Sequence, residues 1–241
     1  GETRRTIGRH WRPGVAFTLV GLVAAWLLLA DAERELTSSL TGLLIAATPI
    51  IAAFLDRFTG GEQRLDVVQM TGLAIGLAGV AVLAGHGIGG GSAWPVIEVL
   101  LVAACYATGP LIAARYLADV PGPALTAATL GLAAIVCLPL AVPVWPREVP
   151  SGQALLAILA LAVVCTALAF IVFFALIREV GPTKAPIITY VNPAVALIAG
   201  ALVLHEPITW SHLVGLGLIL CGSVAATRRT STASPAPPEL P

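Results

Sequence analysis

Residues 192–197 read Asn-Pro-Ala-Val-Ala-Leu, and residues 48–53 read Thr-Pro-Ile-Ile-Ala-Ala, so the chain carries one short pattern twice. Each proline is followed thirteen positions later by a glutamate, Glu206 in the second copy and Glu62 in the first. The copies are 144 positions apart, an offset that becomes 143 after the glutamates. Further matched pairs are Arg34 with Arg178, Gly72 with Gly215, and Gly79 with Gly222. Such a duplication in apolar sequence is typical of transporters that hold a substrate between two related halves.

The composition indicates a membrane protein. Of the 241 residues, 58% are hydrophobic and only 11% are charged, and the mean hydropathy is +0.94. Soluble domains carry about 25% charged residues, so we expect lipid to cover much of this apolar surface. The formal net charge is zero and the sequence has no long basic tract, so we expect no nucleic acid partner.

Eight segments are apolar over about the 20 residues that a helix needs to cross the hydrocarbon layer. Within lipid, a single segment can pair all of its backbone groups only as a helix. We therefore expect an all-α, polytopic membrane protein with eight transmembrane helices in this chain. The expected spans are 13–30, 36–55, 66–85, 94–115, 123–144, 153–177, 184–204 and 209–227.

The distribution of Lys and Arg predicts the orientation of these spans. If the N-terminus is cytoplasmic, eleven basic residues fall on the inner side and two on the outer side, as the positive-inside rule requires. The inner residues are Arg4, Arg5, Arg9, Arg12, Arg57, Arg64, Arg115, Arg178, Lys184, Arg228 and Arg229, and the outer ones are Arg34 and Arg147. We expect a multi-pass protein of the plasma or inner membrane with both termini in the cytoplasm.

The duplication and this topology together predict an inverted repeat. The three spans within 13–85 match the three within 153–227, but the first set begins by running outward and the second by running inward. Two further spans precede the second set, so a complete repeat has five helices, and we expect the first repeat to lack two. The expected organisation is a cytoplasmic loop (1–12), a truncated first repeat of three helices (13–85), a linker (86–93), a five-helix second repeat (94–227) and a disordered cytoplasmic tail (228–241).

The chain resembles the EamA type of the drug/metabolite transporter superfamily from about residue 13 to residue 228. The resemblance is carried by Tyr190-Val191-Asn192-Pro193 through Leu204-His205-Glu206-Pro207 and, more weakly, by Thr48-Pro49 through Gly61-Glu62, each followed by two glycines. It implies ten helices in two EamA repeats and secondary transport of small metabolites across the lipid bilayer by alternating access. Members of the family carry varied substrates, so the resemblance names no particular one.

Nine residues are candidates for the substrate pathway: Trp26, Thr48, Pro49, Glu98, Tyr106, Thr166, Tyr190, Asn192 and Pro193. Pro49 and Pro193 each interrupt backbone hydrogen bonding inside a span, which either shapes and flexes the pathway or is a static packing kink. Asn192 brings an amide into apolar sequence, where it contacts substrate or bonds a neighbouring helix. Thr48 occupies the matching position and is the weaker candidate.

The remaining pathway candidates are aromatic, hydroxyl and acidic side chains. Trp26, Tyr106, Thr166 and Tyr190 are suited to line a pocket by stacking or hydroxyl contacts, although each also suits a structural role. Glu98 is an acid placed inside a predicted span, where an ionisable group marks a functional site. It either binds a proton or a cationic substrate, or it simply reaches the outer interface.

Glycines that recur in the two copies also indicate residues of helix packing. Small residues let helices approach closely, and five glycines have this role in our interpretation: Gly72, Gly76, Gly79, Gly215 and Gly222. Contact between two copies of the chain in a homodimer is an alternative use of these glycines. Glu62 and Glu206 stand at span ends, and we expect them to act as helix-start charges and loop anchors.

The sequence supports no catalytic residue, cofactor or metal site. The histidines lie outside the span centres, the cysteines lack metal-ligand spacing, and the glycine-rich stretch at 87–91 lacks the Lys-Ser/Thr ending of a phosphate loop. We therefore expect a transporter of a small-molecule substrate and not an enzyme. The alternatives are a non-transporting membrane scaffold or receptor and, less favoured, a lipid-modifying membrane enzyme.

Overall fold

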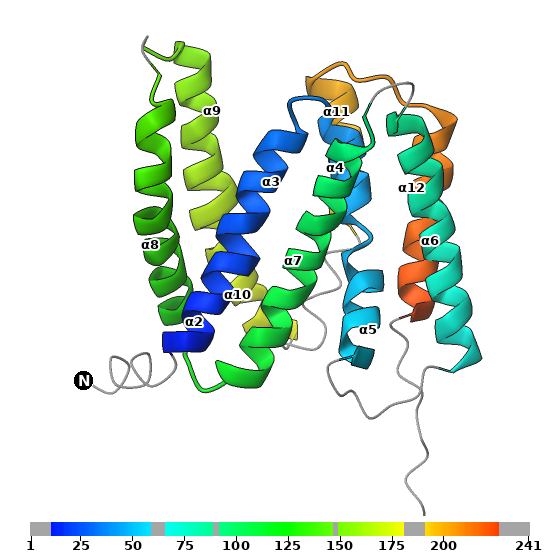
Figure 1. The fold of residues 1–241 in the computed structure, drawn as a ribbon, viewed down its shortest axis with the longest axis horizontal. Coiled ribbons are helices and arrows are strands. Elements are labelled where there is room, and N and C mark those ends of the chain that lie inside the picture. Colours follow the sequence, from blue (N-terminus) through cyan, green and yellow to red (C-terminus); the bar gives the residue numbers. More distant parts are fainter. Residues whose placement is uncertain (1–10, 59–65, 89–91, 147–148, 181–190, 227–241) are drawn as a thin grey trace, which may run out of the picture.

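The structure is a computed structural model that describes residues 11–58, 66–88, 92–146, 149–180 and 191–226 (Figure 1). Within these ranges the regular structure is entirely helical and contains no strand, which is the class expected from the sequence. Tyr190 and Glu62 lie outside the described residues.

The described residues form a series of helices. The first part contains α2 (Trp11–Thr18), the π-helix η1 (Leu19–Ala24), α3 (Ala25–Ala32), α4 (Ser38–Ile45), α5 (Thr48–Phe58) and α6 (Val67–Ile88). The second part contains α7 (Trp94–Tyr116), α8 (Gly122–Ala141), the short 3₁₀-helix η2 (Val142–Val144), α9 (Gly152–Ala162), the π-helix η3 (Val163–Leu168), α10 (Ala169–Val180), α11 (Asn192–Val203) and α12 (Trp210–Ala226).

Several of these helices are long and apolar enough to cross a membrane. Among the described residues, four helical runs meet both conditions: Trp11–Ala32, Val67–Gly85, Trp94–Ala113 and Gly122–Val144. Four shorter apolar helices accompany them: Ser38–Ala52, Gly152–Leu168, Asn192–Val203 and Trp210–Ala226. Many large apolar side chains on these helices are exposed, as expected for surfaces that face lipid.

The expected span at 36–55 is a broken helix. α4 ends at Ile45, and α5 begins at Thr48, whose hydroxyl donates a 2.6 Å hydrogen bond to the Ile45 carbonyl oxygen. Pro49 is the second residue of α5, where the absence of a backbone N–H costs no helical bond. Pro193 has the same place in α11, so both prolines stand at the start of a helix. Figure 1 shows α5 continuing beyond α4 after the break.

Helices α6 and α12 pack closely in antiparallel directions. A Cβ atom at Gly72 would lie 2.5 Å from the backbone nitrogen of Ala226, and the side chain of Leu83 fills the space beside Gly215. Residue numbers therefore rise along α6 as they fall along α12. Figure 1 shows the two helices side by side.

Helices α4 and α11 also pack in antiparallel directions. A Cβ atom at Gly42 would lie 2.6 Å from Cβ of Ala196, and Ser39 lies against Gly200. The most buried apolar side chains come from these helices and from α5, α6, α7 and α12, and include Leu43, Leu44, Leu83, Val99 and Ile219. The protein core thus lies where α4 and α11 meet α6 and α12.

Candidate functional site

One cavity of about 290 Å³ lies among α2, η1, α3, α8 and η3. Its lining residues are Phe17, Leu22, Trp26, Leu125, Thr126, Thr129, Leu130, Cys165 and Thr166, and we call it the Trp26–Thr166 cavity. The cavity brings together Trp26 and Thr166, two candidates for the substrate pathway that are far apart in the sequence. Tyr106 does not line this cavity, but its hydroxyl lies near the Trp26 side chain.

Both π-helices contribute side chains to the lining of this cavity. η1 covers residues 19–24 and η3 covers residues 163–168, so they occupy positions 144 residues apart, the offset of the sequence duplication. Leu22 in η1 and Thr166 in η3 are therefore equivalent positions, and both line the cavity. A π-helix is a wide, rare turn that is found frequently at functional sites.

Two hydroxyl groups of the cavity, those of Thr166 and Thr129, are arranged as acceptors. The Thr166 hydroxyl donates to the Leu161 carbonyl oxygen at 2.9 Å, and the Thr129 hydroxyl donates to the Leu125 carbonyl oxygen at 2.9 Å. Because each hydroxyl hydrogen is engaged, the lone pairs of the oxygen remain available to N–H or O–H donors of a ligand. The nine lining residues include no charged side chain.

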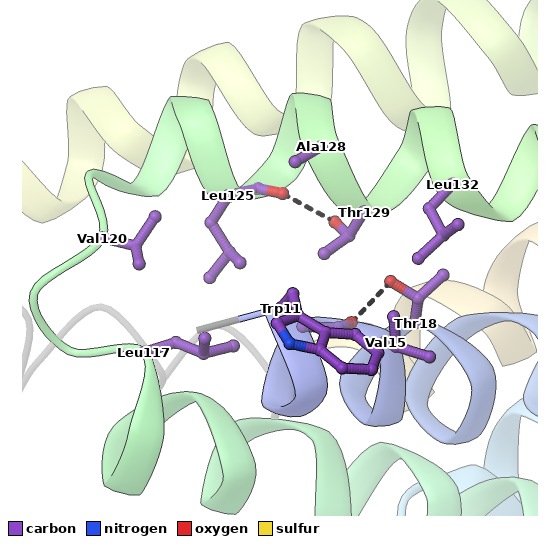
Figure 2. Close-up of a pocket in the computed structure, with 10 residues that line it drawn as sticks. Trp11, Val15, Thr18, Leu117, Val120, Leu125, Ala128, Thr129 and Leu132 are labelled. Atoms are coloured by element: carbon purple, nitrogen blue, oxygen red, sulfur yellow. Dashed lines mark hydrogen bonds between the residues drawn. The ribbon is translucent and has the colours of Figure 1, made fainter. Parts of the chain in front are cut away.

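A second cavity of about 170 Å³ adjoins the first along α8. Figure 2 shows its walls: Trp11, Val15 and Thr18 on α2 face Leu125, Ala128, Thr129 and Leu132 on α8. The Thr18 hydroxyl donates to the Gly14 carbonyl oxygen at 2.9 Å. Because Leu125 and Thr129 line both cavities, the two spaces are neighbours on one turn of α8.

The other pathway candidates do not line either cavity. Glu98 lies on α7 with only 4% of its surface exposed. Thr48 and Pro49 form the start of α5, and Asn192 and Pro193 form the start of α11, where the proline is buried and the asparagine is exposed.

The five glycines singled out for packing lie between α6 and α12. A Cβ atom at Gly222 would lie 2.6 Å from the Gly72 carbonyl oxygen and from Cα of Gly76. One at Gly79 would lie 2.9 Å from Ile219. These positions therefore allow the close approach of the two helices within one chain.

A carboxylate caps the beginning of α4 from outside that helix. Glu206, in the connection between α11 and α12, accepts hydrogen bonds from the backbone N–H groups of Ser38 at 3.0 Å and Ser39 at 2.9 Å. The Thr37 hydroxyl oxygen accepts from Leu40 N–H at 3.3 Å in the same turn. Two of the otherwise free donors at the helix start are thus satisfied by a residue about 170 positions away. We call this arrangement the Glu206 cap.

The surroundings of the Glu206 cap shift the pKa values of two carboxyl groups, those of Glu206 and Glu33. Partial burial acts to raise the pKa of Glu206. Hydrogen bonds from Ser39 and Ser38 act in the opposite direction, as does the nearby His212, and together they lower the pKa below the ordinary 4.5. Burial, followed by the charge of Glu206, raises the pKa of Glu33 at the end of α3.

The sequence predicted a helix-start role for Glu206 but did not predict that the helix would be α4. Glu206 contacts the start of α4 in the first copy of the pattern and not the start of its own following helix, α12. The π-helices and Leu22 were not anticipated either. Their one sequence signal is the 144-residue offset between Leu22 and Thr166.

Comparisons with known proteins match nearly the whole chain. A family model described as the EamA-like transporter family matches residues 2–85 and 93–228. The chain is 28% identical over 223 residues to the uncharacterized inner membrane transporter YedA of Escherichia coli strain K12, an alignment that covers 90% of this chain and 72% of YedA. It is 29% identical over 215 residues to a probable terminal-alkyne amino-acid exporter of Streptantibioticus cattleyicolor, covering 87% of this chain and 71% of the relative.

A solved crystal structure has a similar fold. Its TM-score is 0.61 at 21% sequence identity, and the alignment covers 90% of this chain and 76% of that chain. At this identity the likeness concerns the fold alone.

Proposed function

This chain belongs to the EamA-like transporter family, and from this premise we propose that it moves its substrate by alternating access between two inverted repeats. It is a multi-pass membrane protein that transports small metabolites. In the proposal the chain has eight transmembrane helices and cytoplasmic termini. The first EamA repeat contributes three of these helices and the second repeat five.

The packing of matched helices supports the inverted arrangement. α6 and α12 belong to matched spans of the two sequence copies, and they run antiparallel. Two copies of one fold place matched helices antiparallel when the copies are related by a two-fold axis in the membrane plane. The π-helices η1 and η3, at the same 144-residue offset, support the duplication itself.

We place the substrate in the Trp26–Thr166 cavity. Hydroxyl acceptors and an aromatic face suit a small molecule that carries N–H or O–H donors and an apolar group. The S. cattleyicolor relative is named as a probable exporter of an amino acid with an apolar alkyne group, which supports this substrate class and the outward direction of transport. Tyr106 would orient the Trp26 indole.

The helix starts at Pro49 and Pro193 would supply the movement. Pro49 and Pro193 begin α5 and α11, and in the proposal the backbone next to each proline flexes as access changes. Thr48 and Asn192 would bond the freed backbone or the passing substrate. The buried Glu98 would bind a proton that drives transport.

The observation that carries the proposal is a cavity lined by equivalent positions of both copies, Leu22 and Thr166. A scaffold, a receptor or a lipid-modifying enzyme does not require such a shared cavity. The test is efflux of labelled amino acids and amines from cells that express the full-length gene, the Trp26→Ala variant or the matched Trp145→Ala variant, in which an exposed tryptophan outside the cavity is replaced.

We expect the gene to increase efflux of at least one compound, and we expect Trp26→Ala but not Trp145→Ala to lose it. Equal efflux with and without the gene for the whole panel contradicts the proposal.

A further inference from the structure

We propose that Glu206 is a gating residue: its carboxylate holds the outer ends of the two repeats together, and loss of the Glu206 cap opens the substrate cavity to the outside. This inference rests on the proposed function, because "outer" and "gating" have meaning only for an alternating-access transporter with cytoplasmic termini. Glu206 acts here by positioning α4 and does not contact the substrate.

The Glu206 cap joins the two copies of the sequence pattern. Ser38 and Ser39 begin α4 in the first copy, whereas Glu206 follows α11 in the second. Both points lie at the outer side in the proposed topology. A carboxylate at a helix N-terminus is stabilised by the backbone N–H groups and by the helix dipole, so the cap favours the state in which the outer ends are in contact.

The backbone around Glu206 is shaped for this contact. His205 has a φ of 56°, a left-handed conformation that is uncommon for a residue with a side chain. The following Glu206 N–H donates to the Gly200 carbonyl oxygen at 3.1 Å. A Cβ atom at Gly200 would lie 2.6 Å from Oε2 of Glu206, so the carboxylate has room to reach α4 only because this residue is glycine.

The cap is connected to the cavity through α3. The short segment before α4 leads directly back to α3, which carries Trp26 in the cavity wall. A displacement of the start of α4 therefore moves the end of α3, and with it the wall that contains Trp26. This connection explains how a contact at the outer end could control access to a binding site near the middle of the helices.

Charged groups of both signs lie near the cap, so the contact between Glu206 and α4 can be lost as well as formed. The Glu33 carboxyl group at the end of α3 acts on Glu206 with the same sign of charge, and the buried His212 on α12 favours the Glu206 carboxylate. An exposed Asp31–Arg34 ion pair at 3.6 Å lies nearby, at the end of α3. The balance of these charges allows both a capped and a released state.

Cys165 provides a reporter, because it lines the cavity and is exposed. The experiment uses the full-length protein in oriented membrane vesicles, with Cys105, Cys137 and Cys221 replaced by alanine. A membrane-impermeant methanethiosulfonate reagent is applied from either side, and labelling of Cys165 is measured for the parent, for Glu206→Gln and for the matched control Glu35→Gln.

We expect Glu206→Gln to increase labelling of Cys165 from the outside by about five-fold, the size of effect expected from a lost helix cap. Labelling from the inside should fall, and Glu35→Gln should match the parent. Unchanged labelling in folded Glu206→Gln overturns the gating role. If Cys165 in the parent shows no difference between the two sides with or without transported substrate, both the gate and alternating access are overturned.

A second variant tests the other side of the contact without changing any charge. Ser38→Pro removes one donor of the cap at the first position of α4, where proline is well tolerated, and Thr37 already has the extended conformation (ψ 150°) that a residue before proline prefers. The matched position in the second copy is Pro182. We expect outside labelling to rise less than in Glu206→Gln, and no rise in either variant overturns the inference.

Discussion

Single hydroxyl groups decide what the Trp26–Thr166 cavity can bind. The Thr166 hydroxyl bonds a carbonyl five residues earlier, so the oxygen can accept a further hydrogen bond from a donor in the cavity. A threonine that bonds its own helix outside the cavity provides the natural comparison. Thr108 on α7 is such a residue, because its hydroxyl donates to the Ala104 carbonyl oxygen at 2.7 Å.

Replacing Thr166 with valine should weaken substrate binding while the cavity keeps its shape. The net value of one hydrogen bond is about 0.5–1.5 kcal/mol, so we expect KM for transport to rise about two- to ten-fold with little change in maximal rate. Initial-rate transport in vesicles measures both. Thr108→Val should leave KM unchanged, and an equal increase in both variants would refute a substrate contact at Thr166.

Two carboxyl groups near the start of α4 should have opposite effects on stability. The pKa of Glu206 is lowered. Its ionised form therefore stabilises the folded protein above pH 4.5, and this stabilisation is lost as the pH falls through the folded-state pKa. The pKa of Glu33 is raised, so its ionised form opposes folding at neutral pH and this opposition disappears on acidification.

At pH 7 we therefore expect Glu206→Gln to lower the Tm in detergent and Glu33→Gln to raise it. The Glu33→Gln difference should shrink as the pH falls toward 4.5, because the raised pKa of Glu33 lies above that value. The Glu206→Gln difference should shrink as the pH falls below 4.5, because the pKa of Glu206 is lowered. Thermal unfolding from pH 3 to pH 8 tests this. Shifts of the same sign for the two variants at pH 7 would contradict the assignment.

At the scale of elements, the break between α4 and α5 distinguishes this fold from a bundle of continuous helices. Pro49→Ala would let the two helices join, since alanine supplies an N–H and favours a helix. We expect a Tm equal to or above that of the parent but transport slower by about ten-fold, equivalent to about 1.4 kcal/mol in the barrier. Pro110, inside the continuous helix α7, gives the control.

Pro110→Ala should leave the transport rate close to that of the parent. Parallel measurement of Tm and transport rate separates a moving break from a static kink. A static kink predicts that Pro49→Ala transports as fast as Pro110→Ala.

The pairing of α6 with α12 depends on glycine at the contact. A Cβ atom at Gly222 would lie 2.6 Å from backbone atoms of α6, whereas one at Gly217 meets nothing within 4 Å. Gly222→Ala should therefore lower stability by about 1–3 kcal/mol through overpacking, and Gly217→Ala should not. Thermal unfolding of the two variants in detergent is the measurement, and equal Tm values would show that the helices do not meet at Gly222.

The sequence predicted the helical class, because long apolar runs can pair their backbone groups in lipid only as helices. It placed Pro49 inside a continuous span, whereas the structure places it at the start of α5 after a break in the helix. It also selected Trp26 and Thr166, which share a cavity. It could not predict η1 and η3, since their residues include no proline and a π turn is decided by packing. The sequence also could not predict that Glu206 bonds Ser38 and Ser39, because this contact depends on how two segments distant in the sequence pack together.

At the scale of the whole molecule, the main feature is that matched helices of the two sequence copies pack in antiparallel directions. α6 and α12 are related by the sequence duplication and pack antiparallel. η1 and η3 are related by the same duplication, and both contribute residues to the cavity lining. Inversion of the two copies would let one substrate site face each side of the membrane in turn. Transport by this mechanism therefore depends on the opposite orientation of the two copies.

The most direct test uses Arg34 and Arg178, which are matched positions 144 residues apart. Each is replaced by a single cysteine in a full-length, otherwise cysteine-free protein, and an impermeant thiol reagent is applied to intact cells and to inside-out vesicles. An inverted repeat predicts labelling of position 34 from the outside and of position 178 from the inside. Labelling of both positions from the same side would contradict the inverted repeat and the transport mechanism built on it.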